Sequence, residues 1–393
     1  MSTSKRSGRW MAATLVGVVL LAGCGDKTKP RESVGVMDNP DSHVRRARDL
    51  MFRGDAAEAD KSVGKALELN PNFGPALTLR AVIMASNRDA KAKDILEKGL
   101  AACGKARDCL YDGHVNAIRV HTHLGGGEWL ATAQEYYDKA VKANKDQPDA
   151  YYWMGIAYRA AFDFTRAKDS FRQSIDSDKS AKFFTESATR EWQKMGEIEM
   201  AMPGSPVGKQ VAIKEEISRS DVAALFTSEL DLKRLFEKTR KPDLSFKDPK
   251  QLAAAKARQE KPAPIPDVAG HPLESSIREV LDLNVKGLEL IEGKFDPEKP
   301  VTKAEFAFMI QDILVRALND TELETKFIGE NSKFDDVRSD SPYYNAIVVA
   351  HSRDILKLKD FAKGYFGPND PVNGATALLA IRQLKTSVLG AYY

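Results

Sequence analysis

Three cysteines are the residues of this 393-residue chain with the plainest chemistry. Cys103 and Cys109 are six positions apart, and Gly104 lies between them, so the spacing permits a small disulfide loop. Two unpaired thiols are the alternative. Metal binding by this pair is not expected, because no third and fourth ligand lie nearby in the sequence.

Short motifs in the second half could form helix starts. Thr302-x-x-Glu305 has the pattern of a capping box, in which each side chain accepts a hydrogen bond from the other residue's backbone N–H. Ser218-x-x-Asp221 is a partial version, since Asp has the shorter reach. Asn373 is a good N-cap without a returning acid.

Capping does not explain the basic residues inside these motifs. Arg219 and Lys303 stand in the expected first turn, where the helix dipole disfavours a cation. Free backbone N–H groups beside a cation instead make an anion-binding arrangement. In the third motif, which begins at Asn373, the equivalent position is occupied by Gly374.

No other constellation points to catalysis, a cofactor or a metal. His121 and His123 are two apart, which on a helix places them on nearly opposite faces. Gly125-Gly126-Gly127 has neither a preceding strand nor a following Gly-Lys-Ser/Thr, so we expect a hairpin turn. Paired carboxylates carry little weight in a chain with 29% charged residues. We therefore expect a non-enzymatic protein without cofactor or metal.

The first 23 residues resemble a targeting segment. Lys5, Arg6 and Arg9 precede an apolar run at 11–21, which is too short to span a bilayer. The tetrad Leu21-Ala22-Gly23-Cys24 resembles the lipobox of bacterial lipoproteins, which implies acylation of Cys24 and insertion of the acyl chains into a membrane lipid layer. An ordinary signal peptide with a chance Cys is the alternative. Because an exported chain meets an oxidising compartment, we favour the bridge between Cys103 and Cys109.

The basic excess of the chain belongs to that segment. The formal charge is +3, from 59 Lys and Arg against 56 Asp and Glu. Without Lys5, Arg6 and Arg9 the two counts are equal. A chain with no net charge and no long basic run is a poor candidate for a nucleic-acid binder.

A helical repeat fills the first half. Ala133 and Ala167 are 34 apart, as are Tyr137 and Phe171, and Gly155 lies where two helices would approach closely. This pattern resembles the tetratricopeptide repeat. The resemblance implies about four hairpins between Val44 and Ser180, forming a solenoid whose surface binds a protein partner. The step from Ala92 to Ala133 is 41, and we assign the surplus to an inserted loop at Cys103 to Cys109.

The second half resembles the S-layer homology domain. The resemblance is carried by the Asp-Val starts at Asp267 and Asp336, the Gly-rich loops and the Thr302-Lys303-Ala304-Glu305 motif. It implies a three-pronged helical bundle, with Arg219 and Lys303 binding an acidic cell-wall polysaccharide or a peptidoglycan-associated polymer. Gly374 implies a weak or dead third groove.

The expected fold is all-α, a short tetratricopeptide-type solenoid followed by a three-pronged bundle. The expected segments are a signal peptide (1–23), a flexible tether (24–42), helical repeats (43–180) and S-layer-homology-like repeats (181–393). Within the last segment we expect a degenerate copy (183–230), a linker (241–266) and two clear copies (267–318 and 334–385).

The expected function is envelope attachment. Lipid on Cys24 would hold one end, by resemblance at the outer membrane facing the periplasm. The solenoid would bind an unidentified protein, and the bundle would bind the wall. The alternative is an assembly or secretion scaffold in which the bundle is only a structural or protein-docking unit.

Overall fold

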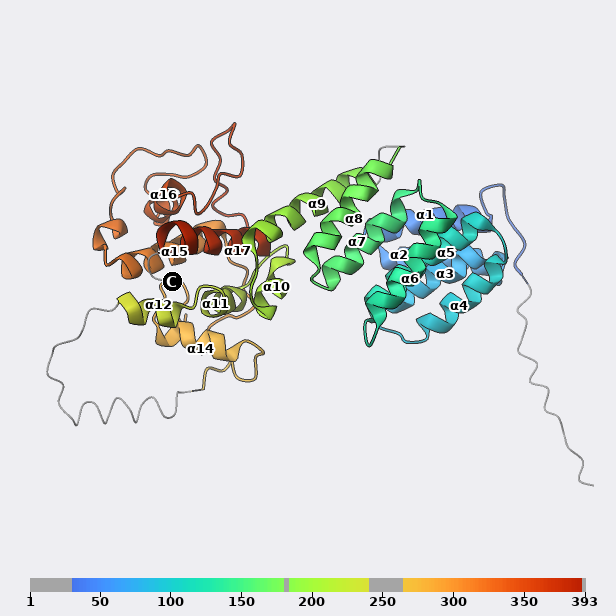
Figure 1. Cartoon of the computed structure of the whole chain (residues 1–393), viewed down its shortest axis with the longest axis horizontal. Coiled ribbons are helices and arrows are strands. Elements are labelled where there is room, and N and C mark those ends of the chain that lie inside the picture. The colour runs from blue at the N-terminus through green and yellow to red at the C-terminus, as the bar shows by residue number, and fades with distance from the viewer. Residues whose placement is uncertain (1–29, 180–183, 240–263, 391–393) are drawn as a thin grey trace, which may run out of the picture.

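The computed structural model describes residues 30–179, 184–239 and 264–390 (Figure 1). Helices and their connecting turns make up these ranges, which contain isolated β-bridges and no β-strand. The helices form two lobes, and helix α9 (Phe184–Ala201) connects them. The all-helical fold expected from the sequence is confirmed.

Eight helices build the N-terminal lobe, and successive helices pack as four hairpins. They are α1 (Pro40–Phe52), α2 (Ala56–Leu69), α3 (Gly74–Ser86), α4 (Ala92–Cys103), α5 (Arg107–Leu124), α6 (Trp129–Ala143), α7 (Pro148–Ala160) and α8 (Phe164–Ser177).

Local sequence signals explain where these helices start. Asp55 and Asp163 cap α2 and α8 by accepting hydrogen bonds from the backbone N–H groups of Glu58 (3.1 Å) and Arg166 (3.0 Å). Proline occupies the first turn of α1, α3 and α7, where its missing N–H costs nothing.

Small residues let the helices cross closely. Ala133 and Ala167 are fully buried. A Cβ atom on Gly155 would lie 2.7 Å from the ring of Phe171, so this glycine is required for the contact between α7 and α8. The sequence assigned the same role to Gly155.

The expected insertion lies elsewhere. The turn between α4 and α5 has only residues 104–106, and most of the surplus length is in α5, which has 18 residues where α7 has 13. Gly125 and its two following glycines form the turn that leads into α6. The loop was misplaced because the repeat register fixes the total length of a hairpin but not which element is lengthened.

The solenoid also begins earlier than expected. Helix α1 starts at Pro40, within the segment expected to be a tether. Before it, the backbone N–H of Arg31 donates to the carbonyl of Glu68 on α2 (2.8 Å), and the Arg31 guanidinium pairs with Asp38 (2.8 Å). Arg31 therefore ties the start of this segment to α2, while residues 32–37 are exposed.

The remaining helices build the C-terminal lobe. They are α10 (Pro206–Ala212), α11 (Arg219–Ser228), α12 (Leu232–Thr239), α14 (Glu274–Asp282), α15 (Lys303–Leu318), α16 (Tyr344–Ser352), α17 (Gly374–Gln383), the 3-10 turn η1 (Thr321–Glu324) and the π turn η2 (Leu384–Val388). Most of the expected linker at 241–266 lies outside the described residues.

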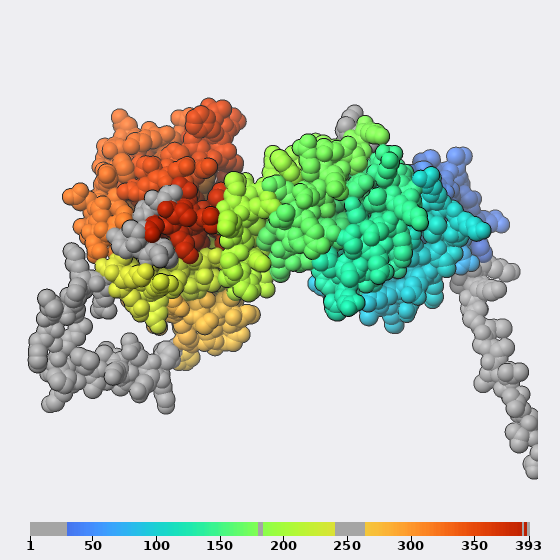
Figure 2. Space-filling view, in the orientation of Figure 1, coloured from blue at the N-terminus to red at the C-terminus, as the bar shows by residue number. Residues whose placement is uncertain are grey.

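Three helix pairs form the prongs of this lobe: α11 with α14, α15 with α16, and α17 with α9. Each pair joins the second helix of one repeat to the first helix of the next, and the third pair closes the circle. Helix α9 also packs on α8, so it belongs to both lobes. Figure 2 shows the two lobes meeting at a narrower middle, and one buried apolar cluster continues from Ile118 in α5 to Leu389.

Candidate functional site

Three residues bind one another in a ring at the centre of the C-terminal lobe. The backbone N–H of Ile217 donates to Val372 (2.9 Å), that of Val372 to Val301 (3.0 Å), and that of Val301 to Ile217 (3.0 Å). Each of these residues directly precedes a helix cap. The closed ring gives the lobe a pseudo-threefold axis, and the degenerate first copy is a full member of it.

The caps beside the ring are formed as the motifs indicate. Thr302 and Glu305 make the reciprocal pair of a capping box, and so do Ser218 and Asp221. The shorter Asp221 carboxylate still accepts from the N–H of Ser218 at 3.0 Å, so the first copy is complete where the sequence indicated a partial box. Asn373 accepts from the N–H of Thr376 at 2.8 Å.

Arg219 lies at the first junction, between the first and second repeats. Its side chain is buried, with the residue 5% exposed. Nε donates to the carbonyl of Phe295 (2.8 Å), and the two terminal nitrogens donate to those of Gly287 (2.7 Å) and Glu289 (2.8 Å). The guanidinium also lies 4.8 Å from the centre of the Phe295 ring. Burial lowers its pKa, and the charge of Glu305 opposes that shift.

Lys303 occupies the same place at the second junction. Its Nζ donates to the carbonyls of Lys357 (2.6 Å) and Phe366 (2.8 Å) and lies 4.3 Å from the centre of the Phe366 ring. Burial lowers the pKa of the ammonium to about 8, partly offset by the negative charge of Asp370. An ammonium has three N–H donors, so one remains for a ligand.

At the third junction, position 374 carries no cation and has no room for a side chain. A Cβ atom on Gly374 would lie 1.7 Å from the carbonyl oxygen of Val211. The N–H of Gly374 instead donates to the carbonyl of Lys214 at 2.9 Å. The helix start of α17 is therefore covered by backbone from α10 and from the turn that follows it.

Two aspartates bind the same loops that Arg219 and Lys303 bind. The sequence analysis did not predict this role. Asp267 accepts from the N–H groups of Phe295 (3.0 Å) and Asp296 (2.7 Å). Asp336 does the same for Phe366 (2.8 Å) and the following Gly367. The repeated Asp-Val start was the signal, because a recurring acid before a buried valine indicates a structural partner.

The first repeat lacks this aspartate and uses Glu229 in its place. The carboxylate of Glu229 accepts from the N–H groups of Gly204 (3.2 Å) and Ser205 (2.8 Å). The loop after α9 is thus held from the end of α11. Nothing in the sequence marks this substitution, since Glu229 lies far from the expected start of the repeat.

A separate pocket lies on the solenoid, where α1, α5, α7 and the start of α9 meet. It has a volume of about 220 Å³. Its lining comprises Arg48, Asp49, Phe52, Asp112, Val115, Asn116, Arg119, Asp149, Trp153 and Phe184. The sequence indicated a binding surface on the solenoid but none of these residues.

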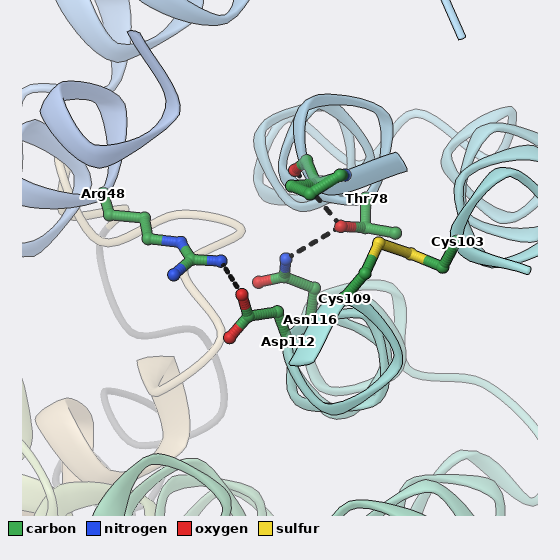
Figure 3. Close-up of a disulfide and its surroundings, with 7 residues drawn as sticks. Arg48, Thr78, Cys103, Cys109, Asp112 and Asn116 are labelled. Atoms are coloured by element: carbon green, nitrogen blue, oxygen red, sulfur yellow. Dashed lines mark hydrogen bonds and ion pairs between the residues drawn. A yellow bond between two sulfur atoms is a disulfide. The ribbon is translucent and has the colours of Figure 1, made fainter. Parts of the chain in front are cut away.

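The disulfide lies beside this pocket (Figure 3). Cys103 at the end of α4 is bonded to Cys109 in the first turn of α5. On the same helix, Asp112 pairs with Arg48 of α1, and Asn116 donates to the hydroxyl of Thr78 (3.1 Å). The bond therefore anchors the end of the helix that supplies four pocket residues.

The lipidation motif at Cys24 lies outside the described residues, together with the rest of the expected signal peptide. Across the ranges that the structure does describe, no helix has the length and apolar character needed to cross a membrane. Those same ranges contain no cluster of three or more His, Cys, Asp or Glu arranged for a metal ion.

Family comparisons match both halves of the chain. The family model of the S-layer homology domain matches residues 333–378. A tetratricopeptide repeat model matches residues 148–180, which include α7 and α8. The chain thus contains both types of module, one associated with the cell surface or envelope and the other with binding of proteins.

Whole-chain comparisons add less. No curated protein matches this chain in sequence. One solved structure, described as "Functional Characterization of Pseudomonas Aeruginosa pilF", is 18% identical and covers 42% of this chain and 93% of its own, with a TM-score of 0.21.

Proposed function

We propose that this protein is a non-catalytic, lipid-anchored envelope protein that attaches a membrane to cell-wall polymer and presents its solenoid to a protein partner. The observation that carries the proposal is the closed ring of Ile217, Val301 and Val372, because it assembles three S-layer-homology-type repeats into one bundle. A wall contact made by such a bundle benefits from the high effective concentration that a membrane anchor provides.

Wall polymer would bind on the outer side of the first two junctions. Arg219 is buried, and its three guanidinium nitrogens each donate a hydrogen bond to a backbone carbonyl group. Its main role is therefore to fix the loop at Phe295. Lys303 retains one donor. Lys299 and Lys359 are about half exposed beside the same junctions and supply cations for an acidic polymer, although each is near a carboxylate, Glu305 and Asp370 respectively.

A second candidate function has its own support. In an assembly scaffold the bundle would serve as a structural or protein-docking unit only. The internal use of Arg219 favours this reading, because that cation is satisfied without any ligand. The two candidates differ in whether purified wall binds the protein at all.

Sedimentation with purified sacculi separates them. Wall binding predicts that the full chain pellets with sacculi and that Lys299→Gln with Lys359→Gln reduces pelleting several-fold. Lys142→Gln, on the exposed side of α6, is the matched control. Full pelleting by the double variant would remove these two cations from the site, and no pelleting by the unaltered protein would favour the scaffold.

Acylation of Cys24 is part of the proposal and is supported by the Leu21-Ala22-Gly23-Cys24 tetrad after an apolar run of the right length. Mass spectrometry of the N-terminal peptide from the exported protein tests it. The expected result is a peptide that begins at Cys24 and carries acyl chains. A peptide with an unmodified Cys24 would contradict the anchor.

A further inference from the structure

The pocket on the solenoid contains a buried cation that lacks a full set of partners. Arg119 is 8% exposed. One of its terminal nitrogens donates to Asn116 at 3.3 Å, and its guanidinium lies 4.1 Å from the centre of the Trp153 ring. Its Nε is buried and has no hydrogen-bond partner. A buried donor without an acceptor is unfavourable, so a ligand oxygen placed there would stabilise it.

The charges around Arg119 determine which oxygen is suitable. Two arginines and three aspartates line the pocket. Arg48 already pairs with Asp112, while no ion pair within 4.0 Å joins Arg119 to Asp149. An incoming carboxylate would therefore enter a pocket with a surplus of acids. An uncharged acceptor meets no such penalty.

Asp149 adds a requirement for a donor. Burial raises the pKa of its carboxyl, and the nearby charge of Asp112 raises it further. A poorly solvated carboxyl group beside Asp112 disfavours a further negative group, whereas a neutral N–H donor meets no repulsion there. A carboxamide offers both features, a carbonyl oxygen for Arg119 and N–H groups for Asp149.

Three aromatic side chains form one part of the pocket lining. Phe52 and Phe184 line it together, and their rings meet edge to face with centres 5.7 Å apart. Trp153 supplies a third aromatic surface. A cavity of about 220 Å³ accommodates one medium-sized side chain with its adjoining backbone.

We propose that this pocket recognises an uncharged amide, namely a Gln or Asn side chain on an extended segment of a protein partner, with its carbonyl oxygen on Arg119. This proposal rests on the proposed function, since it specifies which chemical group of the protein partner the solenoid recognises. It also distinguishes the pocket from a site for acidic peptide termini.

The test titrates the full chain with two capped amino acids that differ in one group. N-acetylglutamine methylamide and N-acetylglutamate methylamide are the probes, and the indole N–H signal of Trp153 in NMR spectra is the readout. We expect saturable binding of the glutamine probe and binding of the glutamate probe about tenfold weaker. Equal or tighter binding of the glutamate probe would overturn the proposal.

Variants link the effect to the pocket. Arg119→Gln should weaken the glutamine probe about tenfold. Arg80→Gln is the control, since Arg80 is another arginine of the solenoid, its Nε lies 3.2 Å from the carboxylate of Asp60, and it lies outside the pocket lining. Asp149→Asn should improve binding of the glutamate probe by lowering the negative charge. If Arg119→Gln fails to fold, Arg119→Lys keeps the charge and removes Nε. Unchanged glutamine binding in a folded Arg119 variant overturns the proposal.

A separate arm distinguishes this inference from the proposed function. A photo-crosslinking amino acid at Asp49, an exposed residue of the lining, reports a nearby partner in cells whatever its side chains. A crosslinked partner without any preference for the amide probe overturns only the inference. Amide preference without a crosslinked partner supports the pocket chemistry and contradicts the partner role of the solenoid.

Discussion

Asp267 and Arg219 bind the two backbone groups of the same residue. The carboxylate of Asp267 accepts from the N–H of Phe295 at 3.0 Å, and Nε of Arg219 donates to the carbonyl of Phe295 at 2.8 Å. Asp336 and Lys303 repeat this arrangement at Phe366, where both distances are 2.8 Å. The aspartate belongs to the same repeat as the loop, and the cation belongs to the preceding repeat. These pairs therefore join neighbouring repeats.

Replacing Arg219 by lysine should destabilise the C-terminal lobe. A lysine ammonium cannot reproduce three donors spread across a planar guanidinium, so at least one buried carbonyl loses its partner. We expect a loss of roughly 2–3 kcal/mol in the free energy of unfolding, measured by urea denaturation. Arg234→Lys, at an exposed site on α12, is the control. Equal stability of the two variants would show that the three contacts contribute nothing.

Restoring a cation at the third junction should fail. Gly374→Arg introduces a Cβ atom where the carbonyl of Val211 lies 1.7 Å away, so the contact between α17 and α10 must open. We expect loss of the folded lobe, or a fall in its melting temperature of many degrees. Gly196→Ala in α9 is the control, because its Cβ would meet nothing closer than 3.9 Å and alanine favours helix.

Lys303 should make stability depend on pH. Burial lowers the pKa of its ammonium in the folded state to about 8, against 10.5 for an unperturbed lysine. Between these values the unfolded chain retains a proton that the folded chain has lost, so the stability carried by this residue rises with pH.

The measurement compares the unaltered protein with Lys303→Met at pH 7.5 and 9.5. The free energy of unfolding of the unaltered protein should increase relative to the variant. Lys286→Met provides the control, because the hydrogen bond that Lys286 donates to Glu324 raises the pKa of Lys286 and no such increase in stability is expected there. A constant difference between the unaltered protein and Lys303→Met would contradict the burial of the ammonium.

Removing the disulfide should weaken the solenoid. The bond closes a short loop, with a sequence separation of 6, so its effect on the unfolded chain is modest. We expect Cys103→Ala with Cys109→Ala to lose about 2 kcal/mol. Hydrogen exchange should show the loss in α4 and α5, whereas the helices of the C-terminal lobe keep their protection. Equal loss in both lobes would indicate a wider role for the bond.

Helix α9 should couple the two lobes. Arg190→Pro removes a backbone hydrogen bond within α9, at a cost of about 3 kcal/mol or more. Because α9 packs on both α8 and α17, protection from exchange should fall in both. Arg190→Ala keeps the backbone donor and is the control. Loss confined to one lobe would show that the lobes are independent.

Periodicity and motifs predicted the helices and the three repeats well. Gly155 and Ala167 indicated the close helix crossings, and the capping boxes indicated the starts of α11 and α15. These features are local, so the residues that show them also form them. The sharing of α9 was not predictable, because it depends on contacts between segments far apart in the sequence.

The role of the cations was only partly predictable. Position in a first turn marked Arg219 and Lys303 as unusual, but their partners are carbonyl groups of loops about 50 to 75 residues away. A backbone carbonyl has no signature in sequence. The pocket at Arg119 was missed for the same reason, since α1, α5, α7 and α9 each contribute only a few residues to it.

Bridging of membrane and wall is the central claim, and one assay measures it directly. Fluorescent lipid vesicles carrying the acylated protein are mixed with purified sacculi, which are then collected at a speed that leaves vesicles in suspension. The account predicts that the vesicles pellet with the sacculi, and that the Cys24→Ser protein pellets without them. Vesicles that stay in suspension while bearing the acylated protein would contradict it.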